Sequence, residues 1–235
     1  EALYRQVIEL NPKHSFALYN LAVFLEKAQA LNSNKQQQQQ QQQQQATTDG
    51  DDEAGAMTSS SKMGPEQREE ILSLYERSVA AQPKDSIGHA DLGRFILEEE
   101  PDRANKHLRR ALDLNPDNEV ALYYHGLHAF ENLNDTAAAQ AVWQHLVAVN
   151  PSHVNGRRRL GQLAVRGEDW AEADMQYATL LEALLDGDKS SLAGEGGCER
   201  SASLLASVRA EVFSVMAIVS KQGSGERRWR CFELA

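Results

Sequence analysis

The chain has 235 residues, enough for one or two domains, and carries a formal net charge of −10 at pH 7. Its composition, 41% hydrophobic and 6% aromatic residues, suits an array of Ala- and Leu-rich helices better than a β-sandwich. The acidic charge argues against nucleic-acid binding, which needs a basic surface, so an RNA-binding protein is a disfavoured alternative. No apolar run approaches the roughly 18 residues that a membrane-spanning helix needs, and we expect no membrane insertion.

The two cysteines, Cys198 and Cys231, do not make a disulfide framework. We therefore expect the cytoplasm or another reducing intracellular compartment. The chain begins inside a helical pattern. Residues 1–12 read as the second helix of a hairpin whose first helix is missing, which suggests a fragment; what precedes Glu1 is left open.

Residues 15–30 form the next predicted first helix, with Leu18, Leu21 and Leu25 at helical spacing. Its partner is predicted to begin near Pro65, because proline suits the first turn of a helix. Between them lies an insertion, residues 31–64, with ten consecutive glutamines and almost no large apolar residue. This low-complexity polyglutamine composition predicts disorder. We favour a tolerated loop expansion, since loop length costs little stability, over a self-association or partner-binding tract.

Three further hairpins are predicted over residues 86–116, 118–151 and 153–185. Second helices end at a recurring proline: Pro12, Pro83, Pro116 and Pro151. Pro83 and Pro116 are 33 residues apart, and Pro116 and Pro151 are 35 apart. Such a period is typical of helical-hairpin arrays. Proline ends each helix because it lacks an amide hydrogen and restricts the preceding residue.

Small and bulky residues recur in phase with these prolines. We expect the small residues to let helix backbones approach closely, and the bulky ones, four places after an alanine, to fill the space between hairpins. The small residues are Gly93, Gly126, Gly161, Ala104, Ala139 and Ala173, and the bulky ones are Leu108, Trp143 and Tyr177.

These residues resemble the tetratricopeptide repeat, with its large residue, Leu-Gly, aromatic, later Ala, second aromatic and closing Pro. The resemblance covers residues 1–185 apart from the insertion, and it departs from the pattern at Ala22 and His125. It implies an all-α fold: a right-handed α-solenoid of stacked antiparallel helical hairpins, whose concave face is lined by the first helices.

Residues 186–198 are rich in Gly and Ser and are predicted to be a flexible linker. Residues 199–221 carry an apolar stripe and are predicted to be a C-terminal capping helix, followed by a tail over residues 222–235. The alternative is an amphipathic helix that docks elsewhere or on a membrane surface, although its polar face is not notably basic.

The resemblance also implies which residues face the groove. The family's groove positions fall on Tyr19, Asn20, Val23, Glu26, Ala90, Asp91, Arg94, Leu97, Tyr123, Tyr124, Leu127, Phe130, Arg158, Arg159, Gln162 and Arg166. The site that we single out consists of Tyr19, Asn20, Arg94, Tyr123, Tyr124, Leu127, Arg158, Arg159, Gln162 and Arg166. An aromatic section would thus lie beside a basic one. We expect an extended peptide with acidic and apolar side chains, whose carboxylates the arginines hold. An ordinary solvated basic face is an equally weighted alternative.

The expected function is non-catalytic protein–protein binding by a scaffold or adaptor, with a protein or peptide partner and no cofactor. The alternative is a substrate-recruiting repeat arm of a larger enzyme such as a glycosyltransferase. No nucleophile–base pair suggests catalysis. His125, His128 and His145 invite a metal site, but no further ligand motif accompanies them, and packed histidines are favoured. The partner, the pathway and the oligomeric state are left open.

Overall fold

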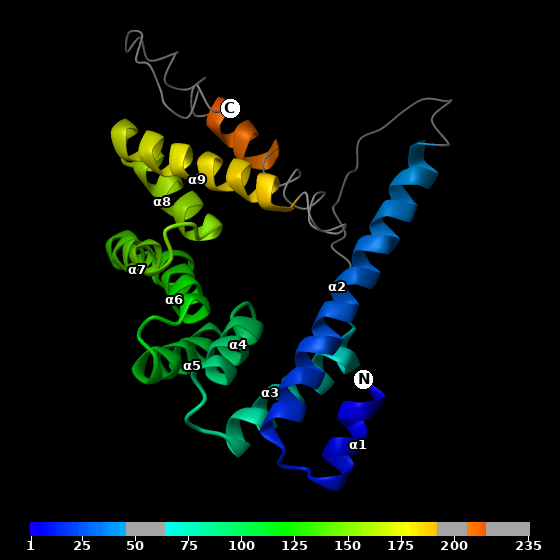
Figure 1. Ribbon diagram of the computed structural model, residues 1–235. Helices are drawn as coiled ribbons and strands as arrows, with labels where there is room; N and C mark the ends of the chain where they lie inside the picture. Colours follow the sequence, from blue (N-terminus) through cyan, green and yellow to red (C-terminus); the bar gives the residue numbers. More distant parts are fainter. Residues whose placement is uncertain (46–63, 192–205, 215–235) are drawn as a thin grey trace. The chain divides into compact units, whose positions relative to one another are not determined.

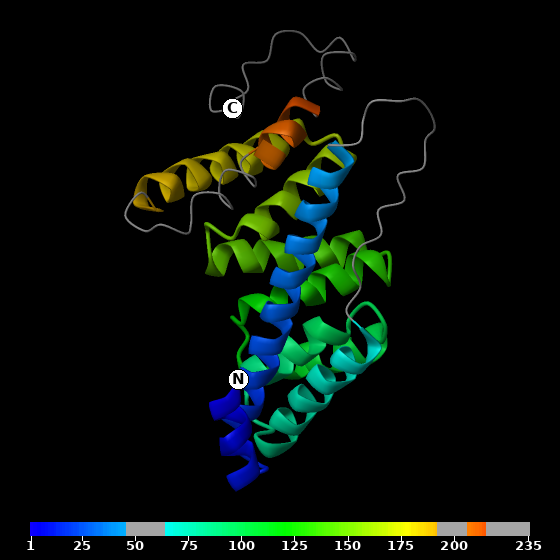
Figure 2. The ribbon, with the colours of Figure 1, turned by 90° about the vertical axis from the view of Figure 1, so that its right-hand side faces the viewer.

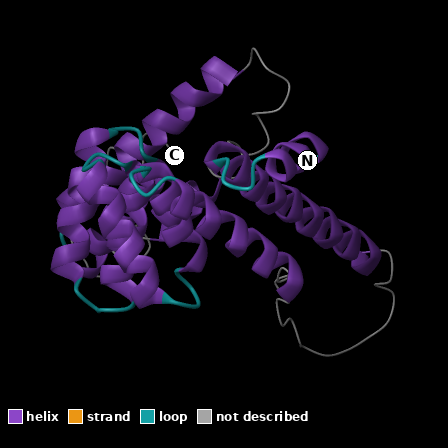
Figure 3. Cartoon of the chain, turned by 90° about the horizontal axis from the view of Figure 1, so that it is seen from below, coloured by secondary structure: helices purple, strands orange, loops and turns teal. Residues whose placement is uncertain are grey.

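The computed structural model describes residues 1–45, 64–191 and 206–214. Every regular element in these ranges is an α-helix, and Figure 3 draws helices and loops without a strand in them. The chain divides into two compact units, Glu1–Pro116 and Asp117–Ala235.

Unit 1 is a set of paired helices (Figure 1). Helices α2 and α3 form one hairpin and α4 and α5 the next, while α1 packs against α2 and α3 packs against α4. The apolar stripes predicted from the sequence are buried, as shown by Leu18 and Leu21 on α2 and by Ile71 and Leu74 on α3. The described helices of this unit are α1 (Ala2–Leu10), α2 (Ser15–Gln45), α3 (Pro65–Ala81), α4 (Ser86–Ile96) and α5 (Pro101–Leu114).

Unit 2 repeats the same plan. Helices α6 and α7 form a hairpin, α8 and α9 form another, and α7 packs against α8. A further short helix at residues 206–214, orange in Figure 1, follows these hairpins. The bounds of the labelled helices are α6 (Glu119–Glu131), α7 (Thr136–Val149), α8 (Val154–Arg166) and α9 (Trp170–Ser191).

The recurring prolines end the helices as expected. α1, α3, α5 and α7 each end two residues before a proline, so one residue lies between the helix and the proline. Those four preceding residues have φ between −145° and −127° and ψ between 78° and 100°, because the proline ring keeps its neighbour out of the helical region. They are Asn11, Gln82, Asn115 and Asn150.

Short polar side chains fix where several helices begin. The carboxylate of Asp85 accepts a hydrogen bond from the Ile87 amide at 3.0 Å. Asn118 and Asp135 accept from amides three residues on, each at 2.9 Å. Each cap satisfies an amide that has no partner within the helix, so the turns between hairpins are defined by local chemistry.

The predicted small and bulky residues meet inside single hairpins. A Cβ atom added at Gly93 would lie 2.8 Å from Leu108, one at Gly161 would lie 2.9 Å from Tyr177, and one at Gly126 would overlap Trp143. Real Cβ contacts essentially never come that close. The bulky side chain therefore occupies the volume that the glycine leaves on the facing helix of its own hairpin. The predicted close approach of the helix backbones is confirmed. The bulky side chains, however, fill space inside each hairpin, whereas we predicted them only between hairpins.

Two helices are longer than the sequence suggested. α2 continues through Gln45, so residues 31–45, including the glutamine tract, are helical rather than disordered. Glutamine is a good helix former, and adding residues to an existing helix avoids the costly nucleation step. α9 likewise continues to Ser191, so residues 186–191 are helical rather than part of a linker. The rest of the predicted insertion, residues 46–63, lies outside the described residues.

Of the helix predicted over residues 199–221, residues 206–214 are described and are helical. The predicted tail and the flanking residues lie outside the described ranges. Within the helix at residues 206–214, Val208 and Val212 are buried, which identifies the face that packs against the rest of unit 2.

A pair of histidines joins α4 to α5 in unit 1. The Nδ1 atoms of His89 and His107 are 3.0 Å apart, and the two rings stack with centroids 5.3 Å apart. The Nε2 atom of His89 lies 3.3 Å from the Pro83 carbonyl oxygen, which only accepts hydrogen bonds. In the neutral pair Nε2–H of His89 therefore donates to Pro83, and Nδ1–H of His107 donates to His89. Burial lowers the pKa of both imidazoles.

Candidate peptide-binding site

The three predicted groove residues of unit 1 are held in internal contacts. Arg94 makes two hydrogen bonds to the carboxylate of Glu26, at 2.6 and 2.7 Å, and a third to Asp91 at 3.2 Å. Tyr19 donates to Asp91 at 2.7 Å. Asn20 donates to the Phe16 carbonyl at 2.7 Å, within its own helix.

The charged groups of this network in unit 1 are paired with one another. Burial acts to raise the pKa of the Glu26 carboxyl, but its hydrogen bonds to Arg94 and the charge of Arg94 hold that pKa below its ordinary value. Tyr75 adds a hydrogen bond to Glu26 at 2.9 Å, and burial raises the pKa of both tyrosine hydroxyls in the network. Arg94 is thus neutralised inside unit 1, and its contacts fasten α4 to α2.

The aromatic section lies on α6 in unit 2. The rings of Tyr123 and Tyr124 meet edge to face, with centroids 5.0 Å apart and an interplanar angle of 84°. Tyr123 also lies 5.9 Å from the His153 ring, and its carbonyl accepts a hydrogen bond from Trp143 Nε1 at 3.2 Å. Both tyrosines and Leu127 are half-buried, so their outer edges remain open to solvent.

The basic section lies on α8 and is only partly paired. Arg158 hydrogen-bonds Glu211 of the helix at 206–214, through Nε at 2.8 Å and also through Nη2. Arg159 has one long contact, 3.4 Å, to Glu131, whose side chain is half exposed. Arg166 is exposed and lies over the Phe130 ring at 5.2 Å, and it has no ion pair with any described residue.

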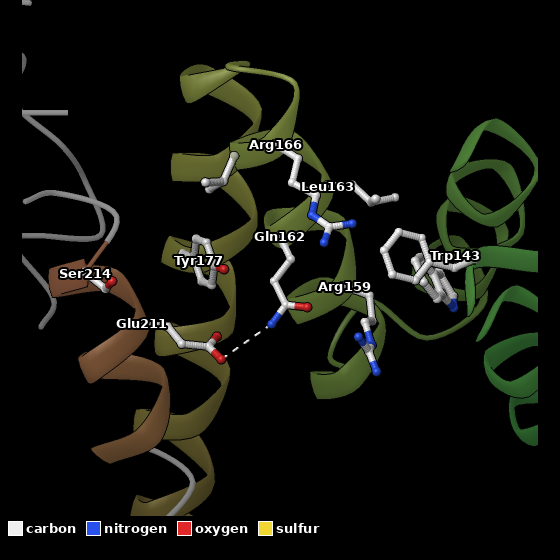
Figure 4. Close-up of a pocket in the computed structure, with 10 residues that line it drawn as sticks. Trp143, Arg159, Gln162, Leu163, Arg166, Tyr177, Glu211 and Ser214 are labelled. Carbon is white, nitrogen blue, oxygen red and sulfur yellow. Dashed lines mark hydrogen bonds between the residues drawn. The ribbon is translucent and has the colours of Figure 1, made fainter. Parts of the chain in front are cut away.

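A cavity of about 340 Å³ opens beside these arginines. In Figure 4 the side chains of Arg159, Gln162 and Arg166 extend from α8 into the space between Trp143 on one side and Glu211 on the other. Gln162 Nε2 donates to Glu211 at 3.4 Å. The residues that line the cavity are Phe130, Trp143, Arg159, Gln162, Leu163, Val165, Arg166, Tyr177, Glu211 and Ser214.

The cavity gathers part of the predicted site. Arg159, Gln162 and Arg166 line it together with Phe130, whereas Tyr123, Tyr124, Leu127 and Arg158 do not. Tyr19, Asn20 and Arg94 belong to the other unit.

Sequence reasoning missed the other six lining residues, which are Trp143, Leu163, Val165, Tyr177, Glu211 and Ser214. Trp143 and Tyr177 were placed in the core, where they are indeed buried, yet one edge of each also faces the cavity. Glu211 lies outside the repeats, so the repeat pattern gave no signal for it. Its position one residue before the buried Val212 was the available hint.

The chemistry of this cavity suits an anionic group beside an apolar one. Two guanidinium groups face one carboxylate, and that carboxylate already pairs with Arg158. The wall opposite Glu211 is aromatic. Among the described residues there is no cluster of three or more His, Cys, Asp or Glu side chains suited to a metal ion. In the same ranges, none of the helices combines the length and apolar character needed to cross a bilayer.

Comparison with known proteins agrees with this architecture. A family model described as a tetratricopeptide repeat matches residues 3–45. The crystal structure of YrrB, a TPR protein with an unusual peptide-binding site, is 13% identical, with a TM-score of 0.52 over 92% of this chain and 97% of that one. PilF of Pseudomonas aeruginosa is 14% identical, with a TM-score of 0.55 over 98% of this chain and 85% of that one. At these identities the likeness concerns the fold, and it confirms the predicted fold class.

A curated relative is Protein O-mannosyl-transferase TMTC3 of Homo sapiens, 23% identical over 154 residues. That match covers 65% of this chain but 13% of the relative's length. The proline-phased hairpins, the repeat matched at residues 3–45 and the shared fold together support a tetratricopeptide-repeat protein.

Proposed function

We propose that the chain is a protein-interaction scaffold that binds a peptide segment with acidic and apolar side chains on the α6 and α8 faces of unit 2. The observation that supports this most is the cavity of about 340 Å³, where two arginines with weak or no pairing border an aromatic wall. That volume is at the lower end of the roughly 300–1,000 Å³ of small-molecule sites, enough for one or two side chains.

The expected contacts follow from the lining. A ligand carboxylate would accept hydrogen bonds from the guanidinium groups of Arg159 and Arg166, and such charge-assisted bonds are stronger than neutral ones. A neighbouring apolar side chain would lie on Phe130 and Trp143. The tyrosine edges on α6 would extend the surface along an extended part of the same peptide.

The test uses a fluorescein-labelled ten-residue peptide that alternates Glu with Leu and Phe, and a matched peptide with Gln in place of Glu. Arg159→Gln together with Arg166→Gln should weaken binding of the acidic peptide at least tenfold and leave the Gln peptide unaffected. The affinity of the wild-type chain should fall as salt rises, because the contacts are partly exposed charges.

The matched control is Arg109→Gln together with Arg110→Gln. These exposed arginines of unit 1 carry the same charge but lie outside the cavity, so fluorescence polarisation should show little change. If both double variants weaken binding equally, the attraction is due to overall charge, and the proposed site is wrong.

A second candidate is a substrate-recruiting arm of a larger enzyme, and the likeness to an O-mannosyl-transferase favours it. The interaction surface would be the same, but its partner would be the enzyme's substrate. Sequencing the complete transcript separates the two. A glycosyltransferase domain encoded in the same reading frame would support the arm, and its absence would leave the scaffold.

A further inference from the structure

The helix at residues 206–214 occupies part of the site on α8. The carboxylate oxygen Oε1 of Glu211 accepts hydrogen bonds from Arg158 Nε at 2.8 Å and from Gln162 Nε2 at 3.4 Å. Val208 and Val212, four residues apart, are fully buried on the same face of the helix. The short helix therefore presents one acidic and two apolar side chains to unit 2.

These are the side-chain types that the proposed ligand carries. Arg158 and Gln162 were both predicted to face the ligand, and both are bonded instead to the chain's own Glu211. The hydrogen bond to Glu211 raises the pKa of the Arg158 guanidinium, because it favours the charged form. A peptide that needs Arg158 must displace Glu211 first.

The fit of the short helix is imperfect. Oε2 of Glu211 and Nε of Arg209 are buried, and neither has a hydrogen-bond partner among the described residues. A buried polar atom without a partner loses the hydrogen bonds that it makes to water in the detached state. In addition, an isolated helical segment gains little stability without tertiary packing, so the order of residues 206–214 draws on this contact.

We propose that the helix at 206–214 is an internal competitor, which covers Arg158 and Gln162 until a partner helix with the same arrangement of side chains replaces it. This inference rests on the proposed function and concerns its regulation. The partner segment would be an amphipathic helix with apolar residues at positions i and i+4 and a carboxylate at i+3, as in Val208, Glu211 and Val212. On α8 the bound segment would thus be helical, unlike the extended peptide expected from the sequence.

The experiment measures binding of a fluorescein-labelled synthetic peptide, ASVRAEVFS, which is residues 206–214. It compares the wild-type chain with a full-length variant, Val208→Asp with Val212→Asp, whose own helix should detach. The variant should bind the peptide at least tenfold more tightly than the wild type. Glu211→Lys is the second variant, in case the two buried substitutions disturb folding, and the same increase is expected.

Two controls make the comparison specific. Phe213 lies on the same helix but is 51% exposed, so Phe213→Asp should leave the wild-type result unchanged. Adding Arg158→Glu to the detached variant should abolish binding of the peptide. Far-UV circular dichroism checks that each variant keeps its helices.

Equal affinity for the wild-type chain and a folded detached variant would overturn the inference, and so would no binding to that variant. The proposed function fails separately. If the Glu-rich peptide still binds and depends on Arg159 and Arg166, the site stands and only the competition is wrong. If neither peptide binds any folded variant, both are wrong.

Discussion

Gly126→Ala tests the close packing inside the α6–α7 hairpin. A Cβ at residue 126 would lie 2.8 Å from Cδ1 and Cε2 of Trp143, and closer still to its Nε1. Trp143 is fully buried, and its Nε1 donates to the Tyr123 carbonyl at 3.2 Å, so the ring cannot shift without losing this bond. The added methyl group has nowhere to go unless the two helices separate.

The expected magnitude combines opposing contributions. Overpacking of a dense core costs about 1–3 kcal/mol. Weakening the Trp143 hydrogen bond costs about 1 kcal/mol more. Alanine in place of glycine within a helix returns about 1 kcal/mol. The net loss is about 2 kcal/mol, which would lower the melting temperature of a unit of this size by about 10 °C.

The assay is urea and thermal unfolding followed by far-UV circular dichroism. Gly167→Ala is the matched control in the same unit, because a Cβ there would meet only backbone oxygens at 3.6 and 3.7 Å. Its effect should stay within about 0.5 kcal/mol. In a Trp143→Leu background Gly126→Ala should cost much less, as expected for residues in contact. A Gly126→Ala variant as stable as the wild type, or an equal cost in both backgrounds, would refute the close-packing explanation.

Three further predictions concern polar contacts. Arg94→Met should lower the unfolding free energy of unit 1 by about 2 kcal/mol, because Glu26 loses two charge-assisted hydrogen bonds where only 24% of its side chain is exposed. Adding Glu26→Gln to this variant should recover part of the lost free energy. If the double variant recovers none of it, the pairing of Arg94 with Glu26 is not the cause. Because burial lowers the pKa of His89 and His107 in the folded state, the unfolded chain takes up protons first. The stability of unit 1 should be constant above about pH 7 and fall as pH drops below about 6.5. The midpoints of urea unfolding should show a smaller fall in His107→Asn, whose amide can still donate to His89. If stability falls with pH as steeply in this variant as in the wild type, these histidines are not the cause. Asp135→Ala should cost about 1 kcal/mol in unit 2 and Asp135→Asn far less, because only alanine removes the cap on α7; equal melting temperatures for the two variants would rule out the cap.

The hairpins could be predicted because their signals are local and repeated. Each proline acts on the residue before it, so the helix ends at Asn11, Gln82, Asn115 and Asn150 follow from neighbouring residues alone. The small and bulky positions recur in phase with these ends. Their agreement across three hairpins made the close approach predictable without coordinates.

The errors came from non-local effects. Composition suggested disorder for the glutamines, but composition ignores that a packed helix can continue into a neutral tract. The repeat pattern placed both Glu26 and Arg94 at groove positions, but it could not show that the two pair with each other across 68 residues and the insertion. Glu211 likewise meets Arg158 across 53 residues. The repeat pattern assigned both Arg94 and Arg158 to the groove. In the structure each of them is paired with a carboxylate that is distant in the sequence, and this pairing competes with any ligand.

Because the glutamine tract continues α2, its length determines where this helix ends and on which side of the helix axis its last residue lies. Figure 2 shows this helix, in blue, as a single straight rod. Residues 31–45 extend it by about 22 Å beyond the predicted repeat helix, at about 1.5 Å per residue. Each glutamine gained or lost would also turn the point where the chain leaves the rod by about 100°. Variants that differ by one or two glutamines would therefore place the last residue of the tract on a different side of the helix axis, while the addition of about eighteen, five full turns, would restore the original side.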